Sequence, residues 1–237
     1  MASRLRTLGI VLTVIGLIFA VAGGVAYSKV QDGYGSLQAF SEAQNVTLTY
    51  NEDEQLIDRG TTEEAQAIKE LLTDDWSYAV VESDLDPNDP LVNTASEYMF
   101  MMATIGYHVL HGTQTVVLAE AAEFDGEVIA AGTYEVPVDG RYWTGFARTD
   151  LLDGPARDGA WSGTAHALVA ELGVGAATHS TLQLALGVAA LLAGLGVVSS
   201  VMGVAFIWQV RSSGKKDGKD EGAASKDDEP VVAAANA

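Results

Sequence analysis

Apolar residues are concentrated in two uncharged segments near the ends of the chain. The first runs from Leu8 to Tyr27 and the second from Leu182 to Val210. A helix needs about 20 apolar residues to cross the hydrocarbon core of a bilayer, and both segments meet that length. The pattern therefore predicts transmembrane helices over residues 8–27 and 182–210, and it makes the lipid bilayer the first expected partner of the chain.

The basic residues that flank these segments predict their orientation. Arg4 and Arg6 precede the first segment, and Arg211 and four lysines follow the second, whereas residues 158–181 carry no Lys or Arg. Cytoplasmic loops are enriched in Lys and Arg, so we expect both termini in the cytoplasm and residues 28–181 outside.

The remaining segments complete the predicted layout. Residues 1–7 would be a short cytoplasmic N-terminus, and residues 211–237, which show no periodicity, a disordered cytoplasmic tail. A cleaved signal peptide is the alternative for the first span, because Ala20-Val21-Ala22 fits a small-x-small cleavage site. The apolar segment exceeds the usual signal core of about 7–15 residues, which favours an uncleaved anchor.

Small residues recur at intervals of four along both predicted spans, and such rows let membrane helices approach closely. We therefore predict that helices pack along them, either within the chain or between copies of it. The rows are Gly16, Ala20 and Gly24 in the first span, and Ala190 with Gly194 and Ser199 with Gly203 in the second.

The charge of the chain belongs almost wholly to the segment between the spans. The 237 residues carry a net charge of −19, and residues 28–181 alone hold 26 acidic and 6 basic residues. Such an acidic chain is not expected to bind nucleic acid, because phosphate contacts need clustered Lys and Arg. The absence of cysteine excludes disulfides, thiolate metal sites and cysteine nucleophiles.

Both helical and strand periodicities occur in residues 28–181. We therefore predict an α+β fold, in which two transmembrane helices flank one mixed α/β extracytoplasmic domain. The expected turns are Asn51–Glu54, Asp125-Gly126 and Asp139-Gly140, and two T-x-x-E capping boxes, at Thr61 and at Thr94, open helices. The expected helices are 35–44, 61–72, 95–111 and 161–172, and the expected strands are 46–50, 55–58, 76–81, 115–118, 127–130 and 133–138.

Two histidines on one predicted helix are a candidate metal site. His108 and His111 are spaced i, i+3 and share a helix face, so a third ligand from elsewhere would complete a site. Asp150, Glu171 or His166 are the candidates for that ligand. The alternative is that both histidines lie at a helix C-terminus because the helix dipole favours them there.

An acidic loop is a weak candidate calcium site. Asp84, Asp86 and Asn88 follow the D-x-D-x-N spacing that begins a calcium loop, but Asp89 stands at the sixth position, where such loops have glycine. The alternative is a Pro-rich turn in which Asp and Asn side chains bond to the local backbone.

No catalytic motif accompanies these residues. The chain has no nucleophile elbow, P-loop, dinucleotide fingerprint or H-E-x-x-H sequence. Aromatic residues gather around Gly140-Arg141, where they would either line a ligand groove or pack in the core: Tyr134, Tyr142, Trp143 and Phe146. We expect no enzymatic activity and no bound cofactor.

Three stretches of the chain resemble a family of actinobacterial two-span membrane proteins. They are Arg-Thr-Leu-Gly-Ile-Val-Leu-Thr-Val-Ile-Gly (6–16), Gly-Thr-Tyr-Glu-Val-Pro-Val-Asp-Gly-Arg-Tyr-Trp (132–143) and Trp-Ser-Gly-Thr-Ala-His (161–166). The resemblance covers residues 1–210. Members often carry the automatic label of aromatic ring-opening dioxygenase, which implies iron held by two histidines and a carboxylate; His108 and His111 match only the histidines.

The sequence as a whole predicts an integral membrane protein of the cell envelope. We expect its outer domain to act in protein interaction or to support an assembly, with membrane or envelope proteins, or further copies of the chain, as partners. One alternative is an extracytoplasmic sensor of a ligand or ion. A further alternative is a His-dependent metalloenzyme of the dioxygenase type.

Overall fold

A computed structural model describes residues 2–224 of the chain. It combines helices and strands, and it divides into two compact units, one formed by the residues up to Asp32 and from Gln183 on, the other by Gly33–Leu182. In chain order the elements are α1 (Ala2–Gln44), β1 (Thr49–Tyr50), β2 (Leu56–Ile57), α2 (Thr62–Glu70), the π-helical turn η1 (Leu71–Asp75), the 3₁₀ turn η2 (Glu82–Asp84), α3 (Ala95–Leu110), β3 (Thr113–Leu118), β4 (Ala122–Phe124), β5 (Glu127–Ile129), β6 (Gly132–Pro137), the 3₁₀ turn η3 (Trp143–Gly145), α4 (Asp153–Ala160) and α5 (Gly163–Ala224).

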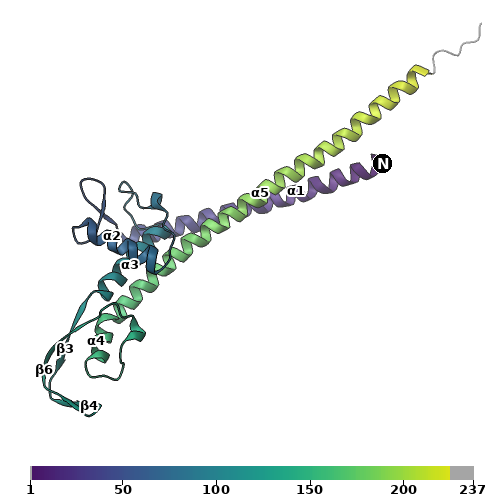
Figure 1. Cartoon of the computed structure of the whole chain (residues 1–237). Coiled ribbons are helices and arrows are strands. Elements are labelled where there is room, and N and C mark those ends of the chain that lie inside the picture. Colours follow the sequence, from purple (N-terminus) through teal and green to yellow (C-terminus); the bar gives the residue numbers. More distant parts are fainter. Residues whose placement is uncertain (1, 225–237) are drawn as a thin grey trace, which may run out of the picture. The chain divides into compact units, whose positions relative to one another are not determined.

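The first unit is a pair of antiparallel helices, the N-terminal part of α1 and the C-terminal part of α5 (Figure 1). Both α1 and the part of α5 up to Ser212 are long and apolar enough to cross a membrane. Neither helix contains proline. Once a helix has formed, its extension by further residues costs little free energy. Segments 35–44 and 161–172, expected as separate helices, are therefore parts of α1 and α5.

Small residues spaced by seven bring the two helices together. We call these positions the glycine seam: Gly9, Gly16 and Gly23 of α1 with Ala189, Gly196 and Gly203 of α5. A methyl group added to Gly9 would lie 2.7 Å from the carbonyl oxygen of Gly203, and one added to Gly23 would lie 2.9 Å from that of Ala189. The backbones therefore meet with no room for a side chain.

The predicted rows of four are confirmed only in part. Gly16, Ala20 and Gly203 pack between α1 and α5, but a side chain added to Gly24 or Gly194 would meet nothing within 4 Å. The reason is periodicity, since two helices that stay in contact along their length repeat their contacts every seven residues.

The second unit has α3 at its centre. One core cluster packs α3 against α2 and the hairpin β1–β2, with Ile68, Leu72 and Phe100 buried in it. The C-terminal part of α1 and the N-terminal part of α5 contribute Leu37 and Ala176 to the same cluster. The long apolar helices therefore also supply core residues to this domain.

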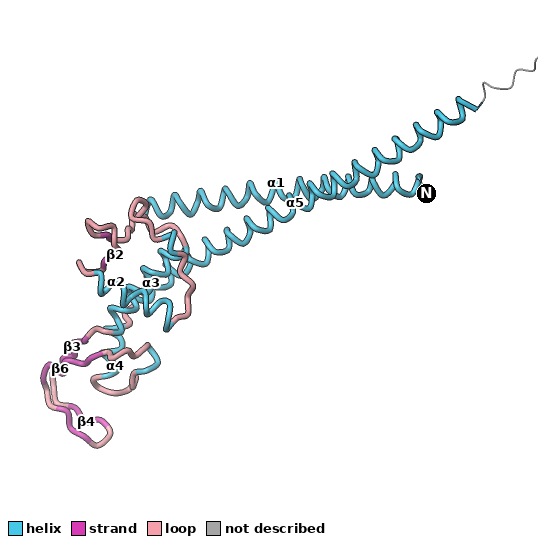
Figure 2. The backbone as a smooth tube through the Cα atoms, turned by 45° about the horizontal axis from the view of Figure 1, so that its top comes forward, coloured by secondary structure: helices cyan, strands magenta, loops and turns pink. Residues whose placement is uncertain are grey.

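A second core cluster lies where a two-stranded ribbon meets α4. β3 pairs with β6 in antiparallel register from Thr113–Pro137 to Leu118–Gly132, and β4 pairs with β5 (Figure 2). The cluster includes Val116, Val138 and Ala156.

Most expected turns and caps of this domain are confirmed. Thr94 and Glu97 form a reciprocal capping box, and Thr61 accepts a hydrogen bond from the Glu64 amide. The turn after Tyr50 returns the chain into β2, and Asp125 has a φ of 49°, as a tight Asp-Gly hairpin turn requires.

The secondary structure differs from the expected one in several places. Residues 76–81 form no strand, because the π-helical turn prolongs α2 to Asp75 and Ser77 adopts a φ of 52°. Helix α4 was not expected, since two glycines and a proline give it low helix propensity. Helix α5 includes residues 211–224 of the predicted disordered tail, and residues 225–237 of that tail lie outside the described residues.

Candidate functional site

The two histidines of the predicted metal site point to different partners. His108 Nε2 lies 2.7 Å from Asp58 Oδ2, just after β2, and both side chains are largely buried. His111 caps the end of α3, where its Nδ1 donates to the Tyr107 carbonyl oxygen at 2.9 Å and its ring lies against the Tyr107 ring. The acid next to His108 is thus Asp58, which the sequence did not single out.

Two of the three candidate third ligands are engaged elsewhere, and the third, Glu171, lines a separate cavity among α1, α3 and α5. Asp150 accepts the amides of Leu152 and Asp153 at 2.8 Å, and the His166 ring meets the Trp143 ring edge-on at 5.1 Å. Among residues 2–212, whose side chains the structure describes, no three His, Asp or Glu side chains form a group that could hold a metal ion. His108 and His111 therefore have no third ligand among these residues.

The acidic loop has the geometry of a turn. Asp86 Oδ1 accepts the Asn88 backbone amide at 2.8 Å and the Asn88 side-chain amide at 3.0 Å, and these hydrogen bonds lower the pKa of Asp86. Asp84 lies in η2. These contacts are those of the Asx turn that the sequence offered as the alternative, and a calcium site at Asp84, Asp86 and Asn88 stays a prediction.

The predicted aromatic cluster packs beside α4. Tyr142 stacks on Trp161 at 5.7 Å and accepts a hydrogen bond from the Trp76 indole at 2.8 Å. Arg157 lies over the Trp143 ring at 4.2 Å. Tyr134 bonds instead to the Ala130 carbonyl within the ribbon. Packing, rather than a ligand groove, accounts for these contacts.

The N-terminus of α3 holds two buried ionisable groups. Glu97, 1% exposed, accepts hydrogen bonds from Asn93 and Thr94, yet burial raises its pKa. His179 of α5, 8% exposed, accepts the Ala95 amide at Nδ1 over 3.1 Å. Burial lowers the pKa of His179, and the negative charge of Asp84 opposes that shift. No local sequence pattern predicts the hydrogen bond between Ala95 and His179, because these residues are 84 positions apart.

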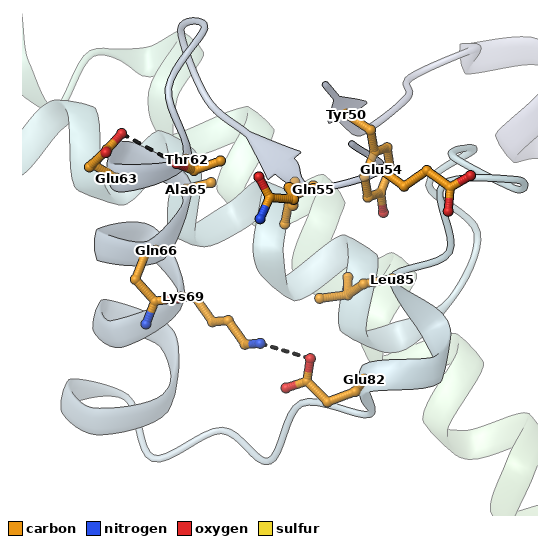
Figure 3. Close-up of a pocket in the computed structure, with 11 residues that line it drawn as sticks. Tyr50, Glu54, Gln55, Thr62, Glu63, Ala65, Gln66, Lys69, Glu82 and Leu85 are labelled. Atoms are coloured by element: carbon orange, nitrogen blue, oxygen red, sulfur yellow. Dashed lines mark hydrogen bonds and ion pairs between the residues drawn. The ribbon is translucent and has the colours of Figure 1, made fainter. Parts of the chain in front are cut away.

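A cavity of about 490 Å³ opens between the hairpin β1–β2, α2 and η2 (Figure 3). Its volume falls within the range of about 300–1,000 Å³ that small-molecule sites occupy. Tyr50, Leu56 and Leu85 give it apolar walls. Lys69 Nζ bonds to Glu82 Oε2 across the cavity at 2.7 Å. This cavity could not be predicted from sequence patterns, because its walls come from three segments that are separate in the chain.

Tyr50 is the unusual residue of the cavity. Its hydroxyl is buried and has no hydrogen-bond partner among the described residues. Burial, with the negative charges of Glu97 and Asp86, raises the pKa of Tyr50 to about 12. Tyr50 therefore keeps its proton at neutral pH and presents a neutral aromatic ring.

A second cavity of about 270 Å³ is nearly all apolar. It lies among α1, α3 and α5, with Phe40, Met101 and Leu168 in its walls. Its polar lining residues are Gln44 and Glu171, together with Ser41 and Tyr98, whose hydroxyls share a buried hydrogen bond of 2.7 Å.

Comparison of the chain with protein-family models, with curated proteins and with solved structures found no match in any of the three. The resemblance to actinobacterial two-span membrane proteins therefore stays a prediction.

Proposed function

We propose that this chain is an integral membrane protein of the cell envelope that crosses the bilayer twice. Its acidic domain, residues 28–181, lies outside the cytoplasmic membrane, and both termini lie in the cytoplasm. The domain binds other proteins or supports an assembly, and it catalyses no reaction.

The glycine seam is the observation that carries the membrane part of this proposal. Lipid tails are as apolar as leucine, so helices associate in a bilayer by close van der Waals packing at small residues. Gly9, Gly16 and Gly23 supply that packing at intervals of seven, while the large side chains of both helices, such as Leu17 and Leu191, point outward. An exposed apolar surface around a tightly packed pair is what lipid would cover.

The distribution of charge supports the proposed orientation. Arg4 and Arg6 precede α1's apolar stretch, and Arg211 and four lysines follow that of α5, so 7 of the 13 basic residues lie outside residues 28–181. Residues 28–181 hold 26 of the 32 acidic residues and only 6 of the basic ones. Short segments next to transmembrane helices are enriched in Lys and Arg when they lie in the cytoplasm.

An exposed aromatic surface beside α4 supports the interaction role. Tyr142 is 44% exposed and Trp143 is 39% exposed, and the buried Arg157 lies over the Trp143 ring. Trp and Tyr are among the residues that most often dominate the binding energy of protein interfaces.

Crosslinking in native membranes tests the interaction role. The tagged full chain is crosslinked, extracted in mild detergent and purified, and we expect a stoichiometric partner. Replacing Trp143 by Ala should remove that partner, whereas Val117→Ala, an exposed change on β3, should retain it. Recovery of the chain alone after crosslinking would contradict the proposed role.

A further inference from the structure

The charges around the 490 Å³ cavity are unbalanced. Glu54, Glu63 and Glu82 line it, and Lys69 is the cation among its lining residues. Lys69 is already paired with Glu82. Among residues 2–212, whose side chains the structure describes, neither Glu54 nor Glu63 forms an ion pair with Lys, Arg or His, so two negative charges have no cation partner there.

The two unpaired carboxylates lie on opposite sides of the cavity. Figure 3 shows Glu63, from α2, at one side and Glu54, from the hairpin turn, at the other. Tyr50, which Figure 3 shows beside Glu54, and Leu85 also line the cavity and provide apolar surface, and the side chains of Gln55 and Gln66 add hydrogen-bonding groups. An extended ligand could contact both carboxylates, whereas a compact ion could not.

The surroundings disfavour an anionic ligand. Residues 28–181 carry 26 acidic against 6 basic residues, and the charges of Glu97 and Asp86 reach Tyr50. The tyrosine ring remains neutral and attracts cations at its face. Charge and shape together call for a cation with an aliphatic chain.

We propose that this cavity binds a linear organic polycation of the aliphatic polyamine class. One ammonium group pairs with Glu54 and another with Glu63, while the methylene chain lies along Tyr50 and Leu85. This site is distinct from the proposed protein-interaction surface beside α4, and it does not depend on that surface having a partner.

Calorimetry of the full chain in phosphatidylcholine nanodiscs tests the proposal, with spermidine as the probe. Butylamine, a monocation with an aliphatic chain, and magnesium chloride, a compact dication, are the controls. We expect spermidine to bind at least about tenfold more tightly than either, because a second ion pair and a cation–π contact add roughly 1–2 kcal/mol. Equal binding of magnesium and spermidine would overturn the proposal, since it would indicate general attraction to an acidic domain.

Matched variants locate the binding site. Glu54→Gln with Glu63→Gln should weaken spermidine binding about tenfold, back to the level of the monocation. Glu120→Gln with Glu123→Gln removes the same charge from exposed positions on or near the ribbon and should leave binding unchanged. Equal losses in the two double variants, or no loss in the first, would overturn the assignment to this cavity. Crosslinking to a protein partner is a separate measurement, so failure here leaves the interaction role untouched.

Discussion

Gly16 of α1 and Gly196 of α5 face each other with no space for a side chain on either. A methyl group on Gly16 would lie 2.7 Å from the Gly196 carbonyl oxygen, and one on Gly196 would lie 2.8 Å from that of Gly16. Gly9 and Gly203 repeat this relationship seven residues away along each helix. The two helices are therefore matched along a shared heptad period, as in an antiparallel coiled coil with glycine in its contact positions.

Replacing Gly16 or Gly196 by Val should separate the two helices. The added side chain meets backbone atoms, which cannot turn aside, so we expect a loss of about 1–3 kcal/mol in stability, the usual cost of overpacking. Unfolding of the full chain in detergent, followed by heat or by added denaturing detergent, measures the loss.

Gly24→Val and Gly194→Val are the matched controls for this prediction. A Cβ at either position meets nothing within 4 Å, so both variants should unfold like the unchanged chain. Equal effects at Gly16 and Gly24 would contradict the seven-residue seam and favour the rows of four.

Replacing Tyr50 by Phe should stabilise the domain. The hydroxyl of Tyr50 is buried without a partner among the described residues, and removing such a group recovers its desolvation cost, about 1–3 kcal/mol. The melting temperature of the full chain should rise. Spermidine binding should be retained, since the aromatic ring remains.

Tyr98→Phe is the matched comparison, with the opposite sign. The Tyr98 hydroxyl bonds to that of Ser41 at 2.7 Å in a buried position, so its loss leaves Ser41 unpaired and should cost about 1–3 kcal/mol. If both Tyr→Phe variants shift the melting temperature in the same direction, the different environments of the two hydroxyls do not govern stability.

His179 should make the stability of the domain fall as pH falls. Burial lowers its folded-state pKa below the ordinary value of 6.5, so the unfolded chain binds the proton more readily. The stabilisation that neutral His179 contributes is present in full above the pKa of the unfolded state. It is lost as the pH falls from that value to the lower pKa of the folded state. Melting temperatures from about pH 7.5 to about pH 5.5 cover the start of this window.

Two carboxyl groups modify this dependence of stability on pH. Asp84 attracts the protonated form and narrows the window, and Glu97, whose pKa burial raises, contributes with the opposite sign at more acidic pH. His179→Gln should flatten the profile between neutral pH and about pH 5.5, whereas the exposed His166→Gln should preserve it. An unchanged slope in His179→Gln would assign the effect to other groups.

Local signals in the sequence predicted caps and turns well, because each depends on a few neighbouring residues. Thr94 with Glu97 forms the expected box, and the Asp125 turn joins β4 to β5. Residues 76–81 look like a strand by composition, but Trp76 donates to Tyr142 and no neighbouring strand pairs with the segment within the described residues. The apolar composition of such a segment indicates that it is buried, but it does not indicate which part of the protein covers it.

The seam and the cavity depend on partners distant in sequence. Rows of four and of seven both occur among the small residues of the spans, and only the position of the facing helix selects Gly23 over Gly24. Asp58 was not expected beside His108, because 50 residues separate them. The 490 Å³ cavity likewise joins the hairpin, α2 and η2, whose proximity no local pattern encodes.

Labelling of single cysteines in intact cells tests the proposed membrane topology most directly. The chain contains no cysteine, so Ser3→Cys and Val128→Cys each introduce one thiol into the full chain, and Val128 is 73% exposed on β5. We predict that a membrane-impermeant maleimide labels Val128→Cys in intact cells and labels Ser3→Cys only after the membrane is opened. Labelling of Ser3→Cys in intact cells, or protection of Val128→Cys there, would contradict the account.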